Sequence, residues 1–529
     1  MTSSTPTIRK QLHKHAADLI ALALVLAGIF ASAWVTQHIY EAVPHIEDEI
    51  AYVWQSKALL NGHLTVPSPP DSKSFLIPFI VDYHGERFGK YPPGWPAVLA
   101  VAIGIGARAW INPLLAGLGV WLTYRLGKRI FSDFVGLLAA GLTVTSPFFL
   151  MNSGTLLSHP LGLVLSAAFT LGWLGSFWDD KATKETLSSS HAKKQWAYAA
   201  LSVLSLGGLM LTRPMTALAI AILFGIHGVY LLFRGDARTR LRLLIFGLVA
   251  MLFIGGYLLW QYSLTGNALL NPYTLWWPYD RVGFGPGHGR GAAGHTLNMI
   301  RINTRSSLSA GRNDLFGWAG YSWIFLPFGI WASRRNPKGL LIGSVALSLI
   351  LVYMTYWIGA SLFGPRYYYE GLYSATLLSA AGIAWLAGWP YSPKTAYLRY
   401  QGWRKLRPLL VTLLVGVLVV INLVAYLPAR LSAMVDLYDI SHSDQALFQA
   451  SSAQVLTPAL IIVHTNSWTE YGALLDLENP ELTSRFIFAW SVSPSTDAAL
   501  VRDFPDRAVY HYYPGRSTQL YQEPLPKQN

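Results

Sequence analysis

Apolar runs of membrane length recur through most of the first 429 residues, and they limit the chain to one broad architecture. Runs of about 17 to 22 apolar residues are long enough to cross a bilayer as helices. With 52% hydrophobic and 13% charged residues, the chain is too apolar for a soluble multidomain protein. The sequence has no cysteine, which excludes disulfides, thiolate metal sites and thiol nucleophiles. We therefore predict an all-α polytopic membrane protein.

The basic residues lie in short blocks between the apolar runs, at 9–14, 125–129, 181–194, 234–242, 334–338 and 394–407. This pattern is typical of cytoplasmic loops, so the net charge of +13 does not indicate nucleic-acid binding. Placing all six blocks inside predicts about eleven net crossings, with the N-terminus inside and the C-terminus outside. The expected spans lie near 17–38, 95–124, 134–151, 157–178, 197–212, 214–233, 243–263, 316–333, 339–359, 371–389 and 408–428.

Two stretches of this topology need a finer prediction. The first span lacks a small-residue cleavage site at its end, so we interpret it as a retained signal anchor. The stretch 95–124 is long for one span and contains Arg108 and the Asn112-Pro113 break. It is predicted to be a re-entrant or interfacial helix followed by a true span, although a single span also fits.

The segments predicted to lie outside hold most of the unusual polar residues, chiefly 39–94, the loop 264–315, which is expected to act as a flap, and the tail. We divide the chain into a transmembrane domain, 1–429, and a small α/β domain, 430–529. In the second domain, 459–464 and 507–512 have the composition of strands, while 470–477 and 496–503 read as helices.

Three acids, Glu47, Asp48 and Glu49, follow the first span and begin a segment with helical apolar spacing, 46–60, expected at the outer interface. Carboxylates in a first helical turn can simply stabilise its N-terminus. They can also bind a cation or accept a proton. Neighbouring residues on a helix diverge by about 100°, so the three cannot all face one cavity. Asp48 is the first candidate and Glu49 the second.

A hairpin is predicted at 79–88, with His84-Gly85 at its tip, and it leads to Lys90 and the pair Pro92-Pro93. The prolines fix an extended backbone that returns to the membrane, so Lys90 is expected at the outer interface. Snorkelling alone would explain a lysine there. The functional alternative is a fixed cation for a lipid phosphate.

Two arginines and a group of aromatic residues are the remaining candidates. Arg213 lies in a tight turn between spans, where it must be paired or solvated. Arg366 can pair with Glu370 four residues later or bind a phosphate. Trp276 and Trp277 precede a glycine-rich stretch that lacks the surroundings of a nucleotide site. Their rings could stack on a sugar or an isoprenoid, or form an interface belt.

These motifs together resemble the GT-C superfamily of polytopic glycosyltransferases. They comprise the acidic pair after the first span, Tyr52, Lys90 before two prolines, the Leu-Thr-Arg-Pro stretch ending at Pro214, and Gly-Pro-Arg-Tyr-Tyr-Tyr-Glu ending at Glu370. Within the superfamily the chain is similar to glycosyltransferase family 39, which includes protein O-mannosyltransferases and lipid A aminoarabinose transferases. The resemblance covers most of the membrane part.

The resemblance implies a polyprenyl-phosphate-sugar donor, with Asp48 as the base that activates an acceptor hydroxyl and Glu49 as its support. Lys90 corresponds to the family's ligand for the donor phosphate, and Arg213 and Arg366 are further candidates for that role. The candidate substrate-binding residues are Tyr52, His159, Tyr367, Tyr368, Glu370, Trp276 and Trp277.

The chain departs from the family pattern at two acidic positions, where it has Gly89 and His159. A divalent metal, if one binds, would have to use Asp48, Glu49 and His159. An imidazole ligand suits Mn or Zn better than Mg.

The sequence therefore predicts an inverting hexosyl- or pentosyltransferase of the inner (plasma) membrane, acting on its outer face. Its partners would be membrane lipids, the lipid-linked donor, and an acceptor that is an envelope glycan, lipid or protein. Two other classes stay open: a lipid-linked glycan flippase or transporter, and an O-antigen-type polymerase or ligase. The first would favour charges paired within spans and internal repeats.

Overall fold

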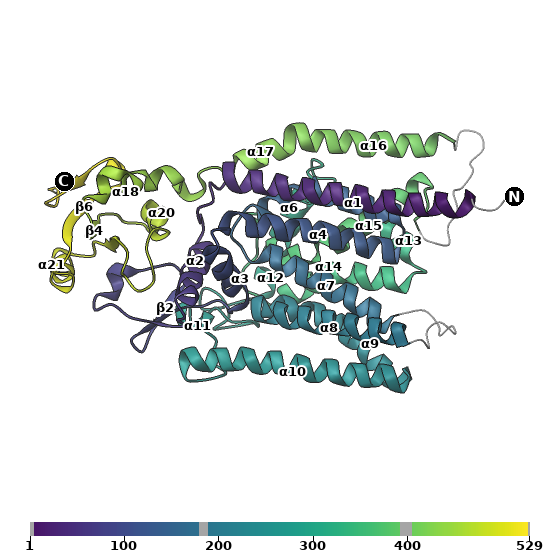
Figure 1. The fold of residues 1–529 in the computed structure, drawn as a ribbon, viewed down its shortest axis with the longest axis horizontal. Helices are drawn as coiled ribbons and strands as arrows, with labels where there is room; N and C mark the ends of the chain where they lie inside the picture. Colours follow the sequence, from purple (N-terminus) through teal and green to yellow (C-terminus); the bar gives the residue numbers. More distant parts are fainter. Residues whose placement is uncertain (1–4, 179–188, 392–404, 527–529) are drawn as a thin grey trace.

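The computed structural model describes residues 5–178, 189–391 and 405–526. Two parts are evident in Figure 1: a long bundle of helices and a smaller mixed part that contains the C-terminus. The N-terminus lies at the opposite end of the bundle. The molecule is therefore elongated, with its polar C-terminal part at one end of an apolar body.

Six helices of the described residues are long and apolar enough to cross a membrane, or seven if the bent pair α5 and α6 forms one span. The six qualifying segments are Ala16–His38, His159–Phe177, Ser190–Thr212, Pro214–Arg234, Ala237–Thr265 and Arg407–Gln449. They confirm a helical membrane protein, while the count of eleven crossings and the orientation stay predictions. The bundle helices are α1 Thr5–His38, α3 Gly94–Gly104, α4 Arg108–Ile130, α5 Asp133–Val144, α6 Pro147–Ser153, α7 His159–Phe177, α8 Ser189–Thr212, α9 Pro214–Arg234, α10 Ala237–Thr265, α13 Leu326–Ser333, α14 Pro337–Tyr353, α15 Leu372–Ala387 and α16 Arg407–Ile421.

Three predicted spans differ from the helices that form. The stretch 134–151 is bent by 62° between α5 and α6. The stretch 95–124 is indeed broken, but the break lies at residues 105–107, where Gly106 adopts a positive φ. Pro113 lies inside α4 and does not interrupt it. In the stretch 316–333 only α13 is helical, because Gly317 and Gly320 have positive φ and the helix starts next to Pro327.

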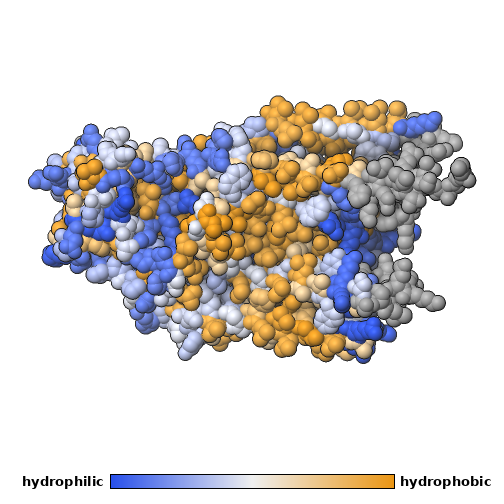
Figure 2. All heavy atoms as spheres, in the orientation of Figure 1, coloured by the Kyte–Doolittle hydropathy of each residue, from blue (hydrophilic) through white to orange (hydrophobic). Residues whose placement is uncertain are grey.

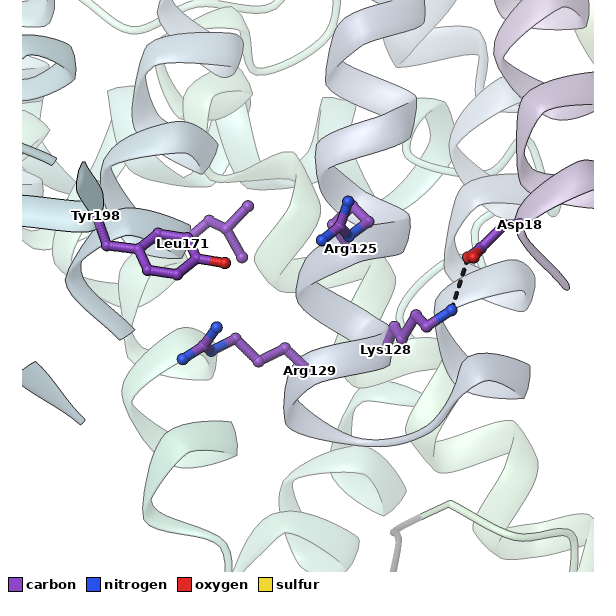
Figure 3. A pocket seen from close by; sticks show the side chains of 6 residues that line it. All are labelled: Asp18, Arg125, Lys128, Arg129, Leu171 and Tyr198. Atoms are coloured by element: carbon purple, nitrogen blue, oxygen red, sulfur yellow. Dashed lines mark hydrogen bonds and ion pairs between the residues drawn. The ribbon is translucent and has the colours of Figure 1, made fainter. Parts of the chain in front are cut away.

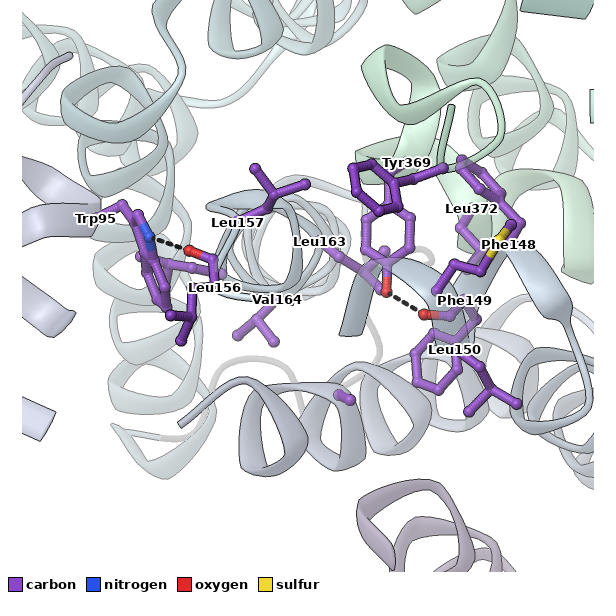
Figure 4. Packing of buried hydrophobic residues seen from close by; sticks show 14 of the residues in the cluster. Trp95, Phe148, Phe149, Leu150, Leu156, Leu157, Leu163, Val164, Tyr369 and Leu372 are labelled. Atoms are coloured by element: carbon purple, nitrogen blue, oxygen red, sulfur yellow. Dashed lines mark hydrogen bonds between the residues drawn. The ribbon is translucent and has the colours of Figure 1, made fainter. Parts of the chain in front are cut away.

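The centre of the bundle is α7, whose most apolar window is 83% buried. Figure 4 shows large side chains from α3, α6 and the segment before α15 packed around it. Trp95 Nε1 donates to the carbonyl of Leu156 at 2.9 Å, and Tyr369 OH donates to the carbonyl of Phe149 at 3.4 Å. The first hydrogen bond fixes the loop that leads to His159 at the start of α7, and the second holds the segment before α15 against α6.

The segments between α1 and α3 form a small structure of their own. Helix α2, Glu47–Leu60, follows the first span, and strands β1 Val66–Pro67, β3 Glu86–Gly89 and β2 Ile80–Tyr83 pair antiparallel in that order. The hairpin turns at His84 and Gly85, both with positive φ, as the sequence predicted. Helix α2 has most of its residues buried, so it is enclosed by other elements and does not lie freely on an interface.

The C-terminal part contains a four-stranded sheet in the order β5-β4-β6-β7. Strands β4 Ala459–Val463, β5 Phe486–Trp490 and β6 Ala508–Tyr512 are parallel, and β7 Leu520–Tyr521 pairs antiparallel with β6. Strands β4 and β6 and helix α21 lie where the sequence indicated, while 470–477 forms only short turns of helix. The helices here are α17 Leu427–Ser432, α18 Ala446–Gln449, α19 Ser451–Gln454, α20 Gly472–Leu475 and α21 Pro494–Asp503.

Asp476 joins the C-terminal part to the bundle. Its two carboxylate oxygens accept hydrogen bonds from Arg108 of α4 at 2.6 and 2.9 Å. Lys57 of α2 lies 3.8 Å from the same carboxylate and also donates to the carbonyl of Glu478 at 3.0 Å. The C-terminal part is thus tied to both the helix that carries the acids and the bundle beneath it.

Polar surface lies at both ends of the bundle, with an apolar band between them (Figure 2). A cavity of about 230 Å³ near the start of α1 is lined by Asp18, Arg125, Lys128, Arg129, Leu171 and Tyr198. Figure 3 shows that Lys128 meets Asp18 there, at 2.6 Å. One of the basic blocks found in the sequence therefore lies at the end remote from the C-terminal part.

Replacing Asp476 with Asn should weaken the docking of the C-terminal part. Arg108 and Lys57 would both lose their carboxylate, and a partly buried donor left without its partner costs about 1–3 kcal/mol. We expect a lower melting temperature for the purified protein in detergent. Asp503→Asn, at an exposed position, is the matched control. Equal melting temperatures for the two variants would contradict this role.

Candidate functional site

Asp48 lies in the first turn of α2 and faces a cavity at the end of the bundle near the C-terminal part. Its Oδ1 accepts a hydrogen bond from Tyr91 OH at 2.7 Å, and its Oδ2 lies 3.5 Å from Arg366 Nη2. Burial raises the pKa of this carboxyl, but Arg366, Tyr91 and Lys90 outweigh it and hold the pKa below the usual value. Asp48 is therefore ionised at neutral pH, as a general base must be.

Glu49 has a different role in the same turn. Its Oε2 accepts from the backbone N–H groups of His45 at 2.9 Å and Ile46 at 3.4 Å, and its Oε1 accepts from that of Leu156 at 2.6 Å. It caps α2 and ties the helix to the loop before α7. Burial raises the pKa of Glu49 to about 7. Glu49 is not among the residues that line the cavity.

Lys90 is held in a cage of aromatic rings. Its Nζ lies 3.5 Å from the ring centre of Phe79 and 4.9 Å from those of Tyr273 and Trp277. Ring faces attract a cation and replace part of its hydration. Burial lowers the pKa of Lys90, although Asp280 and Asp48 oppose this. Snorkelling does not describe this side chain, because it is only 3% exposed.

The carboxylate beside Lys90 is Asp280, which the sequence argument did not single out. Its Oδ2 lies 3.5 Å from Lys90 Nζ, and its Oδ1 accepts from Tyr356 OH at 2.7 Å and Trp357 Nε1 at 2.9 Å. Asp280 comes from the loop between α10 and α12, Leu297–Asp314, just before the glycine-rich stretch. Its position directly after Trp-Trp-Pro-Tyr was the only local signal for it.

The loop that carries Asp280 folds against the end of α14. The N–H of Gly283 donates to the carbonyl of Thr355 at 2.9 Å, and that of Gly289 donates to the carbonyl of Tyr279 at 2.8 Å. Gly289 has a positive φ, and a Cβ there would meet Trp357 at 2.6 Å. Glycine is therefore required at this position for both conformation and space.

Arg213, Glu370 and His159 form a second buried cluster. Glu370 Oε1 lies 2.8 Å from Arg213 Nε and 3.0 Å from His159 Nδ1. Arg213 also donates to Ser158 Oγ at 3.2 Å and to Tyr353 OH at 3.3 Å. The charge of Arg213 in this turn is thus paired. This pairing is expected, because an isolated charge there would cost much free energy.

The predicted local pair of Arg366 with Glu370 does not form. Residues Arg366–Gly371 are a 3-10 helix, in which each residue turns about 120°, so positions i and i+4 lie on different faces. Arg366 instead pairs with Asp48, and Glu370 pairs with Arg213.

These groups surround a cavity of about 320 Å³. Its lining residues are Glu47, Asp48, Tyr52, Phe79, Lys90, Tyr91, Thr212, Arg213, Pro214, Met215, Tyr257, Asn271, Tyr273, Trp277, Asp280, Val282, Arg290, Tyr353, Tyr356, Trp357, Ile358, Arg366 and Tyr367. Seven predicted site residues are among them: Asp48, Tyr52, Lys90, Arg213, Trp277, Arg366 and Tyr367. The other predicted residues lie behind this lining or beside it.

Glu49, His159 and Glu370 are buried behind the cavity and act on the residues that line it. Trp276 packs on Phe79, with ring centres 5.8 Å apart, and Tyr368 lines a small neighbouring cavity. Tyr91 and Asp280 were not predicted as site residues from the sequence, although each contacts a charged side chain that was predicted. Both residues belong to segments that were otherwise recognised.

The predicted metal ligands Asp48, Glu49 and His159 are not brought together. Among the residues that the structure describes, no three His, Asp or Glu side chains are placed to hold one metal ion. Both carboxylate oxygens of Glu49 already accept backbone hydrogen bonds, and His159 Nδ1 is directed to Glu370. As arranged, these residues do not fit a divalent metal.

No known family profile matches the chain, and no curated protein matches its sequence. Solved structures do match its fold. ArnT from Cupriavidus metallidurans bound to undecaprenyl phosphate has a TM-score of 0.55 and 14% identity, over 93% of this chain and 89% of that one. The archaeal oligosaccharyltransferase AglB from Archaeoglobus fulgidus, in complex with an inhibitory peptide and a dolichol-phosphate, has a TM-score of 0.52 and 12% identity, over 93% and 69%.

The apo oligosaccharyltransferase of Archaeoglobus fulgidus gives a TM-score of 0.50 at 12% identity, and this chain spans 65% of its length. The polytopic fold that the sequence motifs indicated is therefore the fold of ArnT and of the archaeal oligosaccharyltransferase.

Replacing Glu370 with Gln should destabilise the protein strongly. Arg213 would keep its buried charge without a carboxylate, which costs about 3 kcal/mol or more. We expect a clear drop in melting temperature in detergent, whereas Glu523→Gln on the exposed C-terminal surface should leave it unchanged. An unchanged melting temperature for Glu370→Gln would show that Arg213 does not depend on this pair.

Proposed function

We propose that the protein is a membrane glycosyltransferase that transfers a sugar from a polyprenyl-phosphate donor to an acceptor hydroxyl. The observation that carries the proposal is the carboxylate of Asp48, which faces one cavity together with cations from separate segments, among them Lys90, Arg213 and Arg366. The GT-C fold supports this assignment. So do two of the structures with that fold, which contain undecaprenyl phosphate and a dolichol-phosphate.

Asp48 acts as the general base in this proposal. Its carboxylate takes the proton of the acceptor hydroxyl while the acceptor oxygen bonds to the anomeric carbon. The bond from that carbon to the phosphate oxygen breaks, and the polyprenyl phosphate leaves with the electron pair. A single displacement of this kind inverts the anomeric carbon. The hydrogen bond from Tyr91 and the charge of Arg366 fix the carboxylate, so it needs little reorganisation.

The cations stabilise the charge that develops on the leaving phosphate. Lys90 and Arg213 line the cavity, and fixed charges in a site with little water act more strongly than in bulk solvent. Asp280 lies 3.5 Å from Lys90 and balances its charge, and a phosphate oxygen would share that cation on binding. Arg366 has a second role, because it also keeps Asp48 ionised.

The aromatic lining would exclude water and hold the donor. Tyr353 and Tyr367 stack with ring centres 5.0 Å apart, and Trp277 and Tyr52 provide further faces. A sugar ring or an isoprenoid unit can lie against such surfaces. The sugar itself, hexose or pentose, is left to direct measurement.

We place the cavity and the C-terminal part on the outer face of the inner (plasma) membrane. The basic cavity at the opposite end, with Arg125, Lys128 and Arg129, supports this orientation because such residues favour the cytoplasmic side. The acceptor would then be an envelope glycan, lipid or protein. No step of the proposed mechanism passes through a metal, and metal dependence stays a prediction.

Asp48→Asn should abolish transfer while leaving the fold intact. Asn is close in size to Asp but cannot accept the proton, and loss of a general base costs about 10²–10⁴-fold in rate. The measurement is transfer of labelled sugar from a polyprenyl-phosphate donor to envelope material, in membranes with equal amounts of protein. Asp82→Asn, on the exposed hairpin, is the control. Full activity of Asp48→Asn would contradict the proposed mechanism.

The pH dependence of transfer should report the low pKa of Asp48. A lowered pKa means that the base form persists as the pH falls, so its acid limb lies below the ordinary Asp value of about 3.9. Arg366 is the largest of the influences that lower the pKa of Asp48, and its removal leaves burial opposed only by Tyr91, Lys90 and Arg213. Arg366→Gln should therefore move the acid limb upward by about one unit or more. An acid limb at the same pH in both proteins would contradict the coupling of the two groups.

A further inference from the structure

Three arginines form a stripe on α12, Leu297–Asp314, outside the residues used so far. Arg305 and Arg312 follow Arg301 by four and eleven positions. On a helix this spacing places the three residues within about 40° of arc and over about 16 Å of length. All three are exposed. No ion pair of these guanidinium groups is found within the described residues.

The stripe borders a groove of about 530 Å³. The groove is lined by Ile300, Arg301, Thr304, Arg305, Leu308, Ser309, Arg312, Trp323 and Met354. Three cations and no acid are among these residues. Guanidinium groups bind phosphate and carboxylate oxygens in pairs, so the groove is suited to an anion with an extended or partly apolar body.

A narrow space connects the groove with the main cavity, which Asp48 faces. A space of about 10 Å³, enough for roughly one water, shares Ile300, Thr304 and Met354 with the groove. It shares Tyr353, Tyr356, Ile358 and Tyr367 with the main cavity. The stripe therefore lies next to the reaction site, but on the other side of a tyrosine wall from Lys90 and Arg213.

We infer that this groove binds an anionic group of the acceptor, a phosphate or carboxylate, at a distance from the hydroxyl that receives the sugar. The inference rests on the proposed function, because it assigns a second substrate to the same reaction. The donor has one phosphate, and Lys90, Arg213 and Arg366 are already available for it. Three further cations beyond the tyrosine wall call for a second anion.

The test compares the wild-type chain with Arg301→Gln/Arg305→Gln/Arg312→Gln, in nanodiscs of zwitterionic lipid. The matched control, Arg485→Gln/Arg502→Gln/Arg516→Gln, removes three exposed charges from the C-terminal part. Inorganic tripolyphosphate is the probe for the groove, with its binding measured by calorimetry while saturating polyprenyl phosphate occupies the main cavity. Stabilisation against heat by polyprenyl phosphate alone reports the donor side.

We expect the α12 variant to lose tripolyphosphate binding and to keep its stabilisation by polyprenyl phosphate. The amount of envelope material needed for half-maximal transfer should rise about tenfold, because each exposed charge contact contributes a few-fold. Maximal transfer should change little, and raised salt should weaken transfer less than in the wild type. The control should behave as the wild type in every measurement.

Unchanged binding of tripolyphosphate and unchanged transfer in the α12 variant would overturn the proposal. A parallel loss of polyprenyl-phosphate stabilisation would also overturn it, because the arginines would then serve the donor or the fold. Displacement of tripolyphosphate from the wild type by phosphatidylglycerol in the nanodisc, with no such effect on the variant, would reassign the groove to an anionic membrane lipid. A wild type that binds tripolyphosphate in the groove but never transfers sugar would refute the proposed function and leave the anion site standing.

Discussion

Charges buried among these helices have to be paired, and the candidate site is built from the pairs that result. Asp48 meets Arg366, Glu370 meets Arg213, and Asp280 lies near Lys90. Each pair joins two segments that are distant in sequence. The first turn of α2, the turn before α9, the 3-10 helix and the loop after α10 therefore meet around one cavity, and loss of either partner of a pair would leave an uncompensated buried charge there.

The acids that follow the first span illustrate how one helical turn divides its roles. Because neighbouring residues diverge on a helix, Asp48 faces the cavity while Glu49 points into the protein. The carboxylate of Glu49 accepts three backbone N–H groups and fixes the helix on the loop before α7. Glu49 thus belongs to the support of the site, and Asp48 to its reactive surface.

Much of this arrangement was predictable from local patterns. Apolar runs located the helices, the Gly at the hairpin tip and the prolines after Lys90 placed that lysine, and the motif order indicated the GT-C fold. Pairing partners were not predictable in this way. One of the two alternatives for Arg366, a pair with Glu370, rested on an α-helical spacing that a 3-10 helix does not provide.

Asp280 and Tyr91 were missed for a related reason. Their importance comes only from contacts with Lys90 and Asp48, and such contacts depend on how distant segments pack. The same limit applies to the proposed metal site. Asp48, Glu49 and His159 were predicted on the same side of the membrane and have side chains that can bind a metal. In the fold, however, Glu49 and His159 have other hydrogen-bond partners.

The aromatic cage around Lys90 has a consequence for which anions the site can hold. Folding has already removed much of the water from this ammonium group, so the cation no longer pays that cost when a ligand arrives. The incoming anion, in contrast, still has to lose its own water. A small phosphate ion, with its tightly held hydration shell, gives up far more on entry than a phosphodiester attached to a long hydrocarbon. The cavity would thus rank anions by how weakly water holds them, and soluble phosphates in the surrounding medium would compete poorly for it.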